Sequence, residues 1–195
     1  MNKKYTLTKD KIKIGSKTLY RIKALRDFGF VKAGDLGGYI ESESNLSHEG
    51  LCWVSGEAKV FGKAWVYGKA WVYGEAWVCG KARVYGKALV YGEARVSGEA
   101  SVWSEAKVFG GARVYGKARV SGGARVYGKA EVWDEARVYG KASVSGEASV
   151  SGKAEVFGKT RVYGSIEVCE TKVYTQSDID LLICKQSSLG KVLFK

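Results

Sequence analysis

Residues 64–93 read AWVYGKAWVYGEAWVCGKARVYGKALVYGE, and this six-residue pattern organises most of the chain. Valine stands at every sixth position from Val54 to Val168, twenty times without an insertion or deletion. The fourth position after each valine is alanine in seventeen of nineteen repeats, except at Thr160 and Ile166. The second position after it is glycine in seventeen of nineteen, except at Ser104 and Asp134. A register held this long predicts one repeated structural unit.

The repeat predicts an all-β fold, a parallel β-helix. In the stretch A-x-V-Y, alternate side chains point to opposite faces, so Ala and Val share the inner face and the x and aromatic positions share the outer one. The Gly-Lys or Gly-Glu pair that follows predicts a corner, because glycine adopts positive φ without a Cβ penalty. Asp134 suits such a corner better than Ser104 does. Three hexads close one triangular coil, and residues 51–173 supply about seven coils of a triangular prism.

Composition agrees with stacked parallel strands. The chain has 195 residues, 26 glycines and no proline. Strands with neighbours on both sides need every backbone N–H, which proline lacks. The missing proline excludes collagen, and the Val and aromatic content excludes disorder. A helix is excluded because valine at every sixth position would spiral around its surface.

We expect the chain to be cytoplasmic. No apolar run approaches the roughly 18 residues that cross a bilayer, and the N-terminus has no apolar signal-peptide region. The four cysteines (Cys52, Cys79, Cys169 and Cys184) form no CxxC pair. We therefore expect reduced thiols, with no disulfide framework and no metal site.

The repeat resembles the hexapeptide-repeat family, whose fold is the left-handed parallel β-helix; the resemblance covers residues 54–168. The flanking segments LYRIKALRDF (19–28), VKAGDLGGYI (31–40) and SNLSHEGLCWV (44–54) are similar to phage and prophage hexapeptide proteins of the YdcK-like group. That resemblance implies a phage or prophage origin. It also implies an acyltransferase label, which in that group rests on the fold.

Both ends read as caps, which divides the chain into residues 1–50, 51–173 and 174–195. Residues 1–50 break the period; TLT, KIKI and LYRIKAL alternate around Gly15-Ser16, which predicts a β-hairpin, and residues 31–53 predict an imperfect entry coil. A stacked coil exposes strand edges at its ends, and such edges need covering. At the other end, Ser177 or Asp178 could cap a short helix to about Lys185, followed by a strand at 192–194; a strand throughout is the alternative.

The resemblance brings an expectation of catalysis that the residues do not support. Hexapeptide acyltransferases use a histidine base between subunits of a trimer, and related carbonic anhydrases use three histidines to hold a metal. This chain has one histidine, His48, and we expect it to be an exposed residue of the cap. Twenty unbroken hexads leave no room for an extruded loop, and the glycines form no GxxxxGK loop. We therefore expect no catalytic residues and no cofactor.

Outward positions fall on three faces, and each face receives one strand from every third hexad. One face carries an aromatic and apolar series that predicts an interface with a second copy or another protein. Its members are Trp71, Tyr73, Leu89, Tyr91, Phe109 and Tyr127. The alternative is an ordinary strand surface, since aromatic residues favour strands and stack across them.

The net charge of +12 is spread over the chain. Basic residues beside aromatic ones are what a nucleotide-like anion would need, with Arg for phosphate and an aromatic ring for stacking. The candidate residues for such a ligand are Arg95, Arg113, Arg119, Arg125 and Tyr115. The alternative is a solvated surface in which Lys and Arg alternate with Glu. Duplex DNA is disfavoured, because no element is shaped to enter a groove.

The sequence leaves three candidate functions open. The first is a non-enzymatic scaffold that forms a homo-oligomer, a dimer or a trimer, through its flat faces. The second is a protein that sequesters a small nucleotide-like anion between subunits. The third is an acyl-CoA-dependent acyltransferase with an atypical site.

Overall fold

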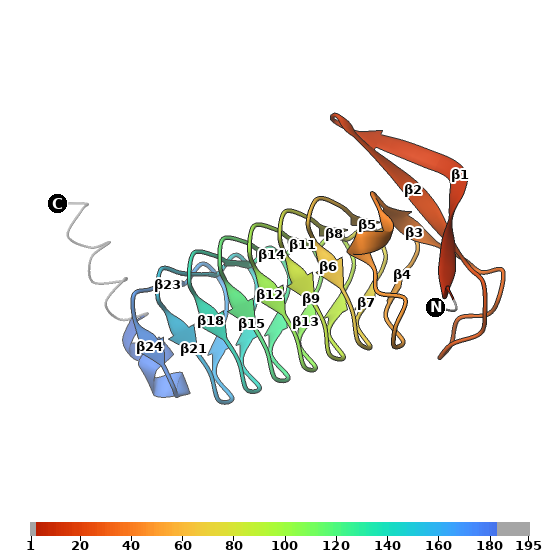
Figure 1. Ribbon diagram of the computed structural model, residues 1–195. Coiled ribbons are helices and arrows are strands. Elements are labelled where there is room, and N and C mark those ends of the chain that lie inside the picture. Colours follow the sequence, from red (N-terminus) through yellow and green to blue (C-terminus); the bar gives the residue numbers. More distant parts are fainter. Residues whose placement is uncertain (1–2, 183–195) are drawn as a thin grey trace.

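The protein is a β-solenoid with an antiparallel hairpin at its N-terminal end (Figure 1). The structure is a computed structural model and describes residues 3–182. Each hexad forms one strand of two or three residues that begins at its x position and includes its Val, and this strand pairs in parallel with the one three hexads later. The predicted parallel β-helix is therefore confirmed.

Three sheets form the sides of the prism. The first contains β1 (Tyr5–Ile14), β2 (Lys17–Ala24), β3 (Leu36–Ile40), β5 (Lys59–Val60), β8 (Trp77–Val78), β11 (Arg95–Val96), β14 (Arg113–Val114), β17 (Glu131–Val132), β20 (Ser149–Ser151) and β23 (Glu167–Cys169). The second contains β6 (Trp65–Val66), β9 (Arg83–Val84), β12 (Ser101–Val102), β15 (Arg119–Val120), β18 (Arg137–Val138), β21 (Glu155–Val156) and β24 (Lys172–Val173). The third contains β4 (Trp53–Val54), β7 (Trp71–Val72), β10 (Leu89–Val90), β13 (Lys107–Val108), β16 (Arg125–Val126), β19 (Ser143–Val144) and β22 (Arg161–Val162).

Valine and alanine fill the interior of the prism. Their side chains are fully buried along the solenoid, as the inward face of the repeat predicts. Thr160 occupies an alanine position and satisfies its hydroxyl by donating to the carbonyl of Phe157 at 2.7 Å. The core is therefore one continuous column of small apolar side chains.

Backbone hydrogen bonds join each coil to the next. In one hexad, the N–H groups of Trp71, Tyr73 and Glu75 donate to carbonyls of Ala88, Val90 and Gly92 at 2.9–3.0 Å. The x, aromatic and corner positions thus each donate to the following coil, which explains why proline has no place in the repeat. Corner glycines have φ near +70°, and Ser104 (φ 59°) and Asp134 (φ 55°) adopt the same left-handed conformation.

The N-terminal residues extend one of the three sheets. Strands β1 and β2 pair antiparallel around Gly15, β2 pairs antiparallel with β3, and β3 pairs in parallel with β5. Leu46 bridges Val66, and β4 pairs with β7, so residues 36–54 make an imperfect coil of their own. The first sheet consequently has eight parallel levels from β3 to β23, one more than the hexads alone predict.

The C-terminal end departs from the period by one residue. Lys172–Val173 pairs with Glu155–Val156 at a spacing one residue shorter than three hexads, because one corner residue is missing after Glu170. The Glu170 side chain compensates, since its Oε1 accepts the backbone N–H of Lys153 at 3.2 Å, where a corner carbonyl accepts elsewhere.

A short helix follows at residues 176–182. It begins at residue 176, so Ser177 and Asp178 lie inside its first turn and neither is the N-cap. Asp178 still satisfies this end, because its Oδ2 accepts the backbone N–H groups of Tyr174 and Thr175, each at 2.8 Å. The expected helix end near Lys185 and the strand at 192–194 lie outside the described residues. Within residues 3–182, no helix is long and apolar enough to cross a membrane.

Candidate binding surface

The outer side of the third sheet, here called the aromatic face, carries all six residues predicted for an interface. Parallel registry places Trp71 beside Leu89, and it aligns the aromatic position of each strand with that of the next. The rings of Tyr73, Tyr91, Phe109 and Tyr127 form one column, with successive centroids 4.8–4.9 Å apart and planes within 3° of parallel. The structure thus brings the six residues together as one surface.

An apolar hollow lies at the N-terminal end of this column. It is lined by Phe30, Ser55, Trp71, Tyr73 and Leu89. The Phe30 side chain is 92% exposed, since Gly29 turns the chain with φ +53° in the loop after β2. Nothing in the sequence singles out Phe30, because it lies in the cap, and the repeat does not indicate where the cap meets the prism.

The other two faces carry shorter aromatic columns. On the second sheet, Tyr67, Tyr85 and Trp103 stack at 4.8 and 5.8 Å, and Ser121 follows them in the register. On the first sheet, Tyr115 stacks on Trp133 at 6.0 Å. Each of these columns spans fewer coils than the four-ring column of the aromatic face.

The five residues predicted for an anionic ligand do not converge. Arg95, Arg113 and Tyr115 lie on the first sheet, Arg119 on the second and Arg125 on the third. The three residues of the first sheet all have partners within the chain. Arg95 lies over the Trp77 ring at 5.5 Å.

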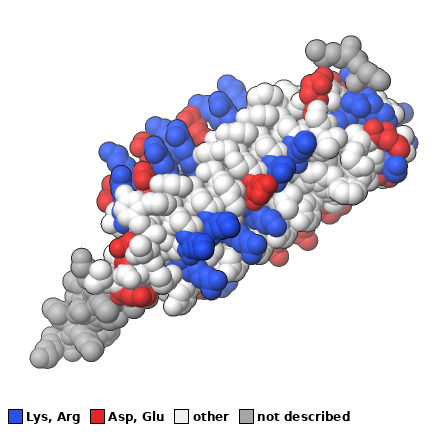
Figure 2. Space-filling view, turned by 90° about the horizontal axis from the view of Figure 1, so that it is seen from below, with Lys and Arg blue, Asp and Glu red and all other residues white. Residues whose placement is uncertain are grey.

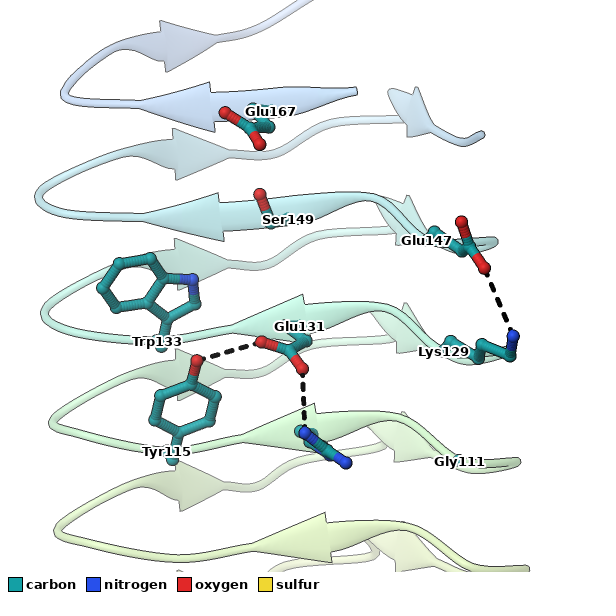
Figure 3. A pocket seen from close by; sticks show the side chains of 9 residues that line it. Gly111, Tyr115, Lys129, Glu131, Trp133, Glu147, Ser149 and Glu167 are labelled. Atoms are coloured by element: carbon teal, nitrogen blue, oxygen red, sulfur yellow. Dashed lines mark hydrogen bonds and ion pairs between the residues drawn. The ribbon is translucent and has the colours of Figure 1, made fainter. Parts of the chain in front are cut away.

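A carboxylate dominates the surroundings of Arg113 and Tyr115. Glu131 accepts from Arg113 Nη1 at 3.2 Å and from the Tyr115 hydroxyl at 3.0 Å (Figure 3). Burial, with the Glu131 hydrogen bond as the second cause, raises the pKa of Tyr115 to about 12. Glu147 and Glu167 line the same hollow. This part of the first sheet is therefore a poor site for an anion.

Basic side chains are grouped elsewhere, as the space-filling view of one side of the molecule shows (Figure 2). On the second sheet, Arg83, Ser101 and Arg119 share a hollow with the Lys81–Glu99 ion pair. On the aromatic face, Arg125 shares a hollow with Lys141, Ser143 and Arg161, and no acidic residue lines it. Of the hollows lined by predicted residues, the one around Arg125 thus has no carboxylate in its lining.

One comparison with known proteins matches part of this body. A family model described as the YdcK beta solenoid repeat matches residues 112–129, a stretch as long as one coil. This match and the stacked parallel coils of the structure indicate the same class of protein. This chain is a β-solenoid repeat protein. A search of curated proteins found no match to it.

The cap of this β-solenoid repeat protein holds its single histidine. The His48 ring stacks on Tyr5 with centroids 4.3 Å apart, and its Nδ1 accepts the backbone N–H of Lys4 at 3.2 Å. Its Nε2 lies 3.5 Å from a carboxylate oxygen of Glu43. The expectation of an exposed histidine is wrong, because the hairpin folds over the ring and leaves 22% of the side chain exposed.

A buried lysine joins the hairpin to the solenoid. Lys4 Nζ donates to the carbonyl of Cys52 at 2.8 Å and lies 3.2 Å from its sulfur, and both residues are fully buried. Burial lowers the pKa of Lys4 and raises the pKa of Cys52. The same ammonium lies 5.0 Å from the Phe28 ring. No spacing in the sequence signals this contact, which the fold alone creates.

The described residues offer little to a metal ion. Among residues 3–182, no group of three or more His, Cys, Asp or Glu is placed to hold one. Cys52, Cys79 and Cys169 are free thiols.

Proposed function

We propose that this β-solenoid repeat protein is a non-catalytic scaffold that self-associates through the N-terminal half of its aromatic face. The observation that carries the proposal is the continuous apolar surface made by the ring column, the adjoining hollow and the exposed Phe30 ring. Exposed apolar surface of this kind marks interaction sites in soluble proteins, and aromatic residues are enriched at interface centres.

Charge limits the extent of the proposed interface. The x positions of β7 and β10 are Trp71 and Leu89, whereas those of β13 and β16 are Lys107 and Arg125. Burying unpaired cations between two copies would cost more than the apolar contact returns. We therefore assign the contact to β4, β7, β10 and the Phe30 loop.

The repeat body also supports a role without catalysis. The valine register runs from Val54 to Val168 without an insertion, so no corner of these coils extrudes a loop that could build a substrate pocket. His48, the only histidine, is stacked in the cap and approaches a single carboxylate. The acyltransferase function that the resemblance implies has no such support in the described residues.

We propose that the scaffold works in the cytoplasm, supported by the free thiols of Cys52, Cys79 and Cys169. A phage or prophage origin rests on the flanking motifs alone.

Light scattering after size exclusion tests the self-association. One copy of the chain has a mass of 21.2 kDa. We expect the full chain to have two or three times this mass, and a double variant with Leu89→Glu and Tyr91→Glu to have the monomer mass. The matched control is Arg83→Glu with Tyr85→Glu, which changes the same two positions one strand earlier on the neighbouring face and should keep the wild-type mass.

Phe30→Ser is a milder variant at an exposed site, so it should fold normally and still weaken the oligomer. A wild-type protein that stays monomeric at the highest concentration reached, or an oligomer unchanged by Leu89→Glu and Tyr91→Glu, would overturn the proposal.

A further inference from the structure

A notch interrupts the aromatic face at β19. The two outward residues there, Ser143 in β19 and Ser145 directly after it, are both small, whereas the repeats one coil away on either side carry an arginine and a tyrosine at the same positions. Registry places Arg125 and Arg161 on the two sides of Ser143. Tyr127 and Tyr163 take the corresponding places beside Ser145, because β16, β19 and β22 pair in register.

The notch is as wide as one missing ring. The Tyr127 ring stacks on Phe109 at 4.9 Å, which ends the column on that side. Its other side faces the position of Ser145, and Tyr163 follows one coil later with 53% of its surface exposed. Two strand spacings separate Tyr127 from Tyr163, about 10 Å. A planar ring placed between them would continue the column at its own spacing.

The floor beside this slot is cationic. A hollow of about 620 Å³ is lined by Gly123, Arg125, Tyr127, Lys141, Ser143 and Arg161. Within the described part of the chain, none of its three cations forms an ion pair. Equivalent cations elsewhere do: Arg113 pairs with Glu131, and Lys129 pairs with Glu147. The positive charge of the hollow is therefore uncompensated.

We propose that this notch binds a mononucleotide. The base lies over Ser145 between the rings of Tyr127 and Tyr163, and the phosphate lies over Ser143 between Arg125 and Arg161, within reach of Lys141. Guanidinium groups bind phosphate through paired charge-assisted hydrogen bonds, and aromatic rings stack on bases. Ser143 and Ser145 are two residues apart in one repeat, a separation similar to that between the base and the 5′-phosphate of a nucleotide.

The second sheet provides an internal comparison. Arg83, Ser101 and Arg119 repeat the arginine–serine–arginine series, but Trp103 fills the aromatic position beside Ser101 and stacks on Tyr85 at 5.8 Å. Glu99 also pairs with Lys81 in that hollow at 2.7 Å. The hollow beside Ser101 therefore offers phosphate contacts without a slot for a base. The missing ring of this face lies one coil later, at Ser121, where Arg137 pairs with Glu155 at 3.5 Å, so we expect no tight mononucleotide binding on this face.

Calorimetry on the full chain with AMP tests the proposal, with adenosine and inorganic phosphate titrated separately. We expect AMP to bind more tightly than either. Ser145→Tyr should abolish binding, because it installs the residue that occurs most often at this position of the repeat and so closes the slot while preserving the fold. Arg161→Ser should weaken binding more than about tenfold, as loss of a charge-assisted contact does. The matched control, Arg119→Ser, should bind AMP like the wild type.

Several results would overturn the assignment. These are an absence of AMP binding, unchanged binding by folded Ser145→Tyr, equal affinity for adenosine or phosphate, an equal loss in Arg119→Ser, or tighter binding of a single-stranded oligonucleotide than of AMP. The inference does not rest on self-association, since β19 lies outside the proposed contact. Ser145→Tyr should therefore keep the wild-type mass in light scattering.

Discussion

At each corner of the solenoid, one residue in the left-handed region turns the chain toward the next side of the prism. Glycine takes this place almost throughout, for two physical reasons. Its φ near +70° would strain other residues, and a Cβ at Gly122 would lie 2.9 Å from the carbonyl oxygen of Gly140 in the next coil. Ser104 and Asp134 show that a short polar side chain can adopt the same conformation at isolated corners.

Gly122 and Gly123 are adjacent in one corner and differ in both respects. Gly122 is left-handed, whereas a Cβ on Gly123 would lie 3.6 Å from the nearest atom, at ordinary contact distance. We expect Gly122→Ala to lower the free energy of unfolding by about 1–2 kcal/mol or more, and Gly123→Ala to leave it unchanged or raise it by up to about 1 kcal/mol. Denaturant titration followed by circular dichroism measures both. Equal effects of the two substitutions would contradict this account of the corner.

The sequence predicts the positions of the hexad residues well and the contacts of single cap residues poorly. The hexad places every Val, Ala and Gly, because each has one environment that repeats in each coil. It could not place the contact between Lys4 and Cys52 or the exposure of Phe30, because these depend on how an irregular cap docks on the prism. The β19 notch, by contrast, is readable in the repeat, since its two outward serines lie three hexads from an Arg-Tyr pair on each side.

In this molecule the outward side chains of stacked strands form columns, so the surroundings of each side chain depend on the residues one coil before and after it. Because the register is fixed at three hexads, the composition of each outer face follows from the sequence, and all six predicted interface residues fall on one sheet. The same spacing places Glu131 beside Arg113 and Ser143 beside Arg125. Two arginines at equivalent repeat positions thus differ in available charge because of the residue one coil later.

The tyrosine columns predict that the free energy of unfolding falls at alkaline pH. Tyrosine in an unfolded chain ionises near pH 10, whereas burial and Glu131 raise the pKa of Tyr115 to about 12. Between these values the unfolded chain has lost a proton that the folded chain keeps, so stability is full below pH 10 and falls as the pH rises to 12. Burial also raises the pKa of Tyr73 and Tyr67, which adds to the loss.

The variant Tyr115→Phe isolates the contribution of Tyr115 to this loss of stability at alkaline pH. We expect the denaturant midpoint to fall less between pH 9 and about 11 in this variant than in the wild type, although loss of the hydrogen bond to Glu131 lowers stability by about 1 kcal/mol at pH 8. Glu131→Gln, which removes the neighbouring charge and keeps an acceptor, should also flatten the profile. Parallel profiles for all three proteins would show that Tyr115 does not contribute.

On the scale of the whole molecule, the solenoid is modular, since each coil contacts only the coils before and after it. Fold class could be predicted because the inner face repeats without change. The eighth level lies where the sequence predicts an imperfect entry coil, and Leu36–Ile40, Leu46 and Trp53–Val54 build it from residues that mostly precede the hexads.

Two deletions test this modularity. Removing residues 94–111 takes out three hexads, which make one coil, and joins Glu93 to Ala112 in phase. We expect this protein to fold, with a lower thermal midpoint and a length shorter by about 4.8 Å in small-angle scattering. Removing the shorter segment 97–111 joins Val96 to Ala112 without a corner glycine and should abolish the cooperative transition. Loss of folding in both, or in neither, would contradict a modular body.

The hydrogen bonds between coils, such as that from Trp71 to Ala88, run along the length of the solenoid. A pulling force on the two ends would therefore act on these bonds lengthwise, opening the coil at one end before it reached the next. Each coil released would add roughly 60 Å of extended chain. A scaffold built this way would yield in small, repeated steps under tension and would shorten again as coils rewound.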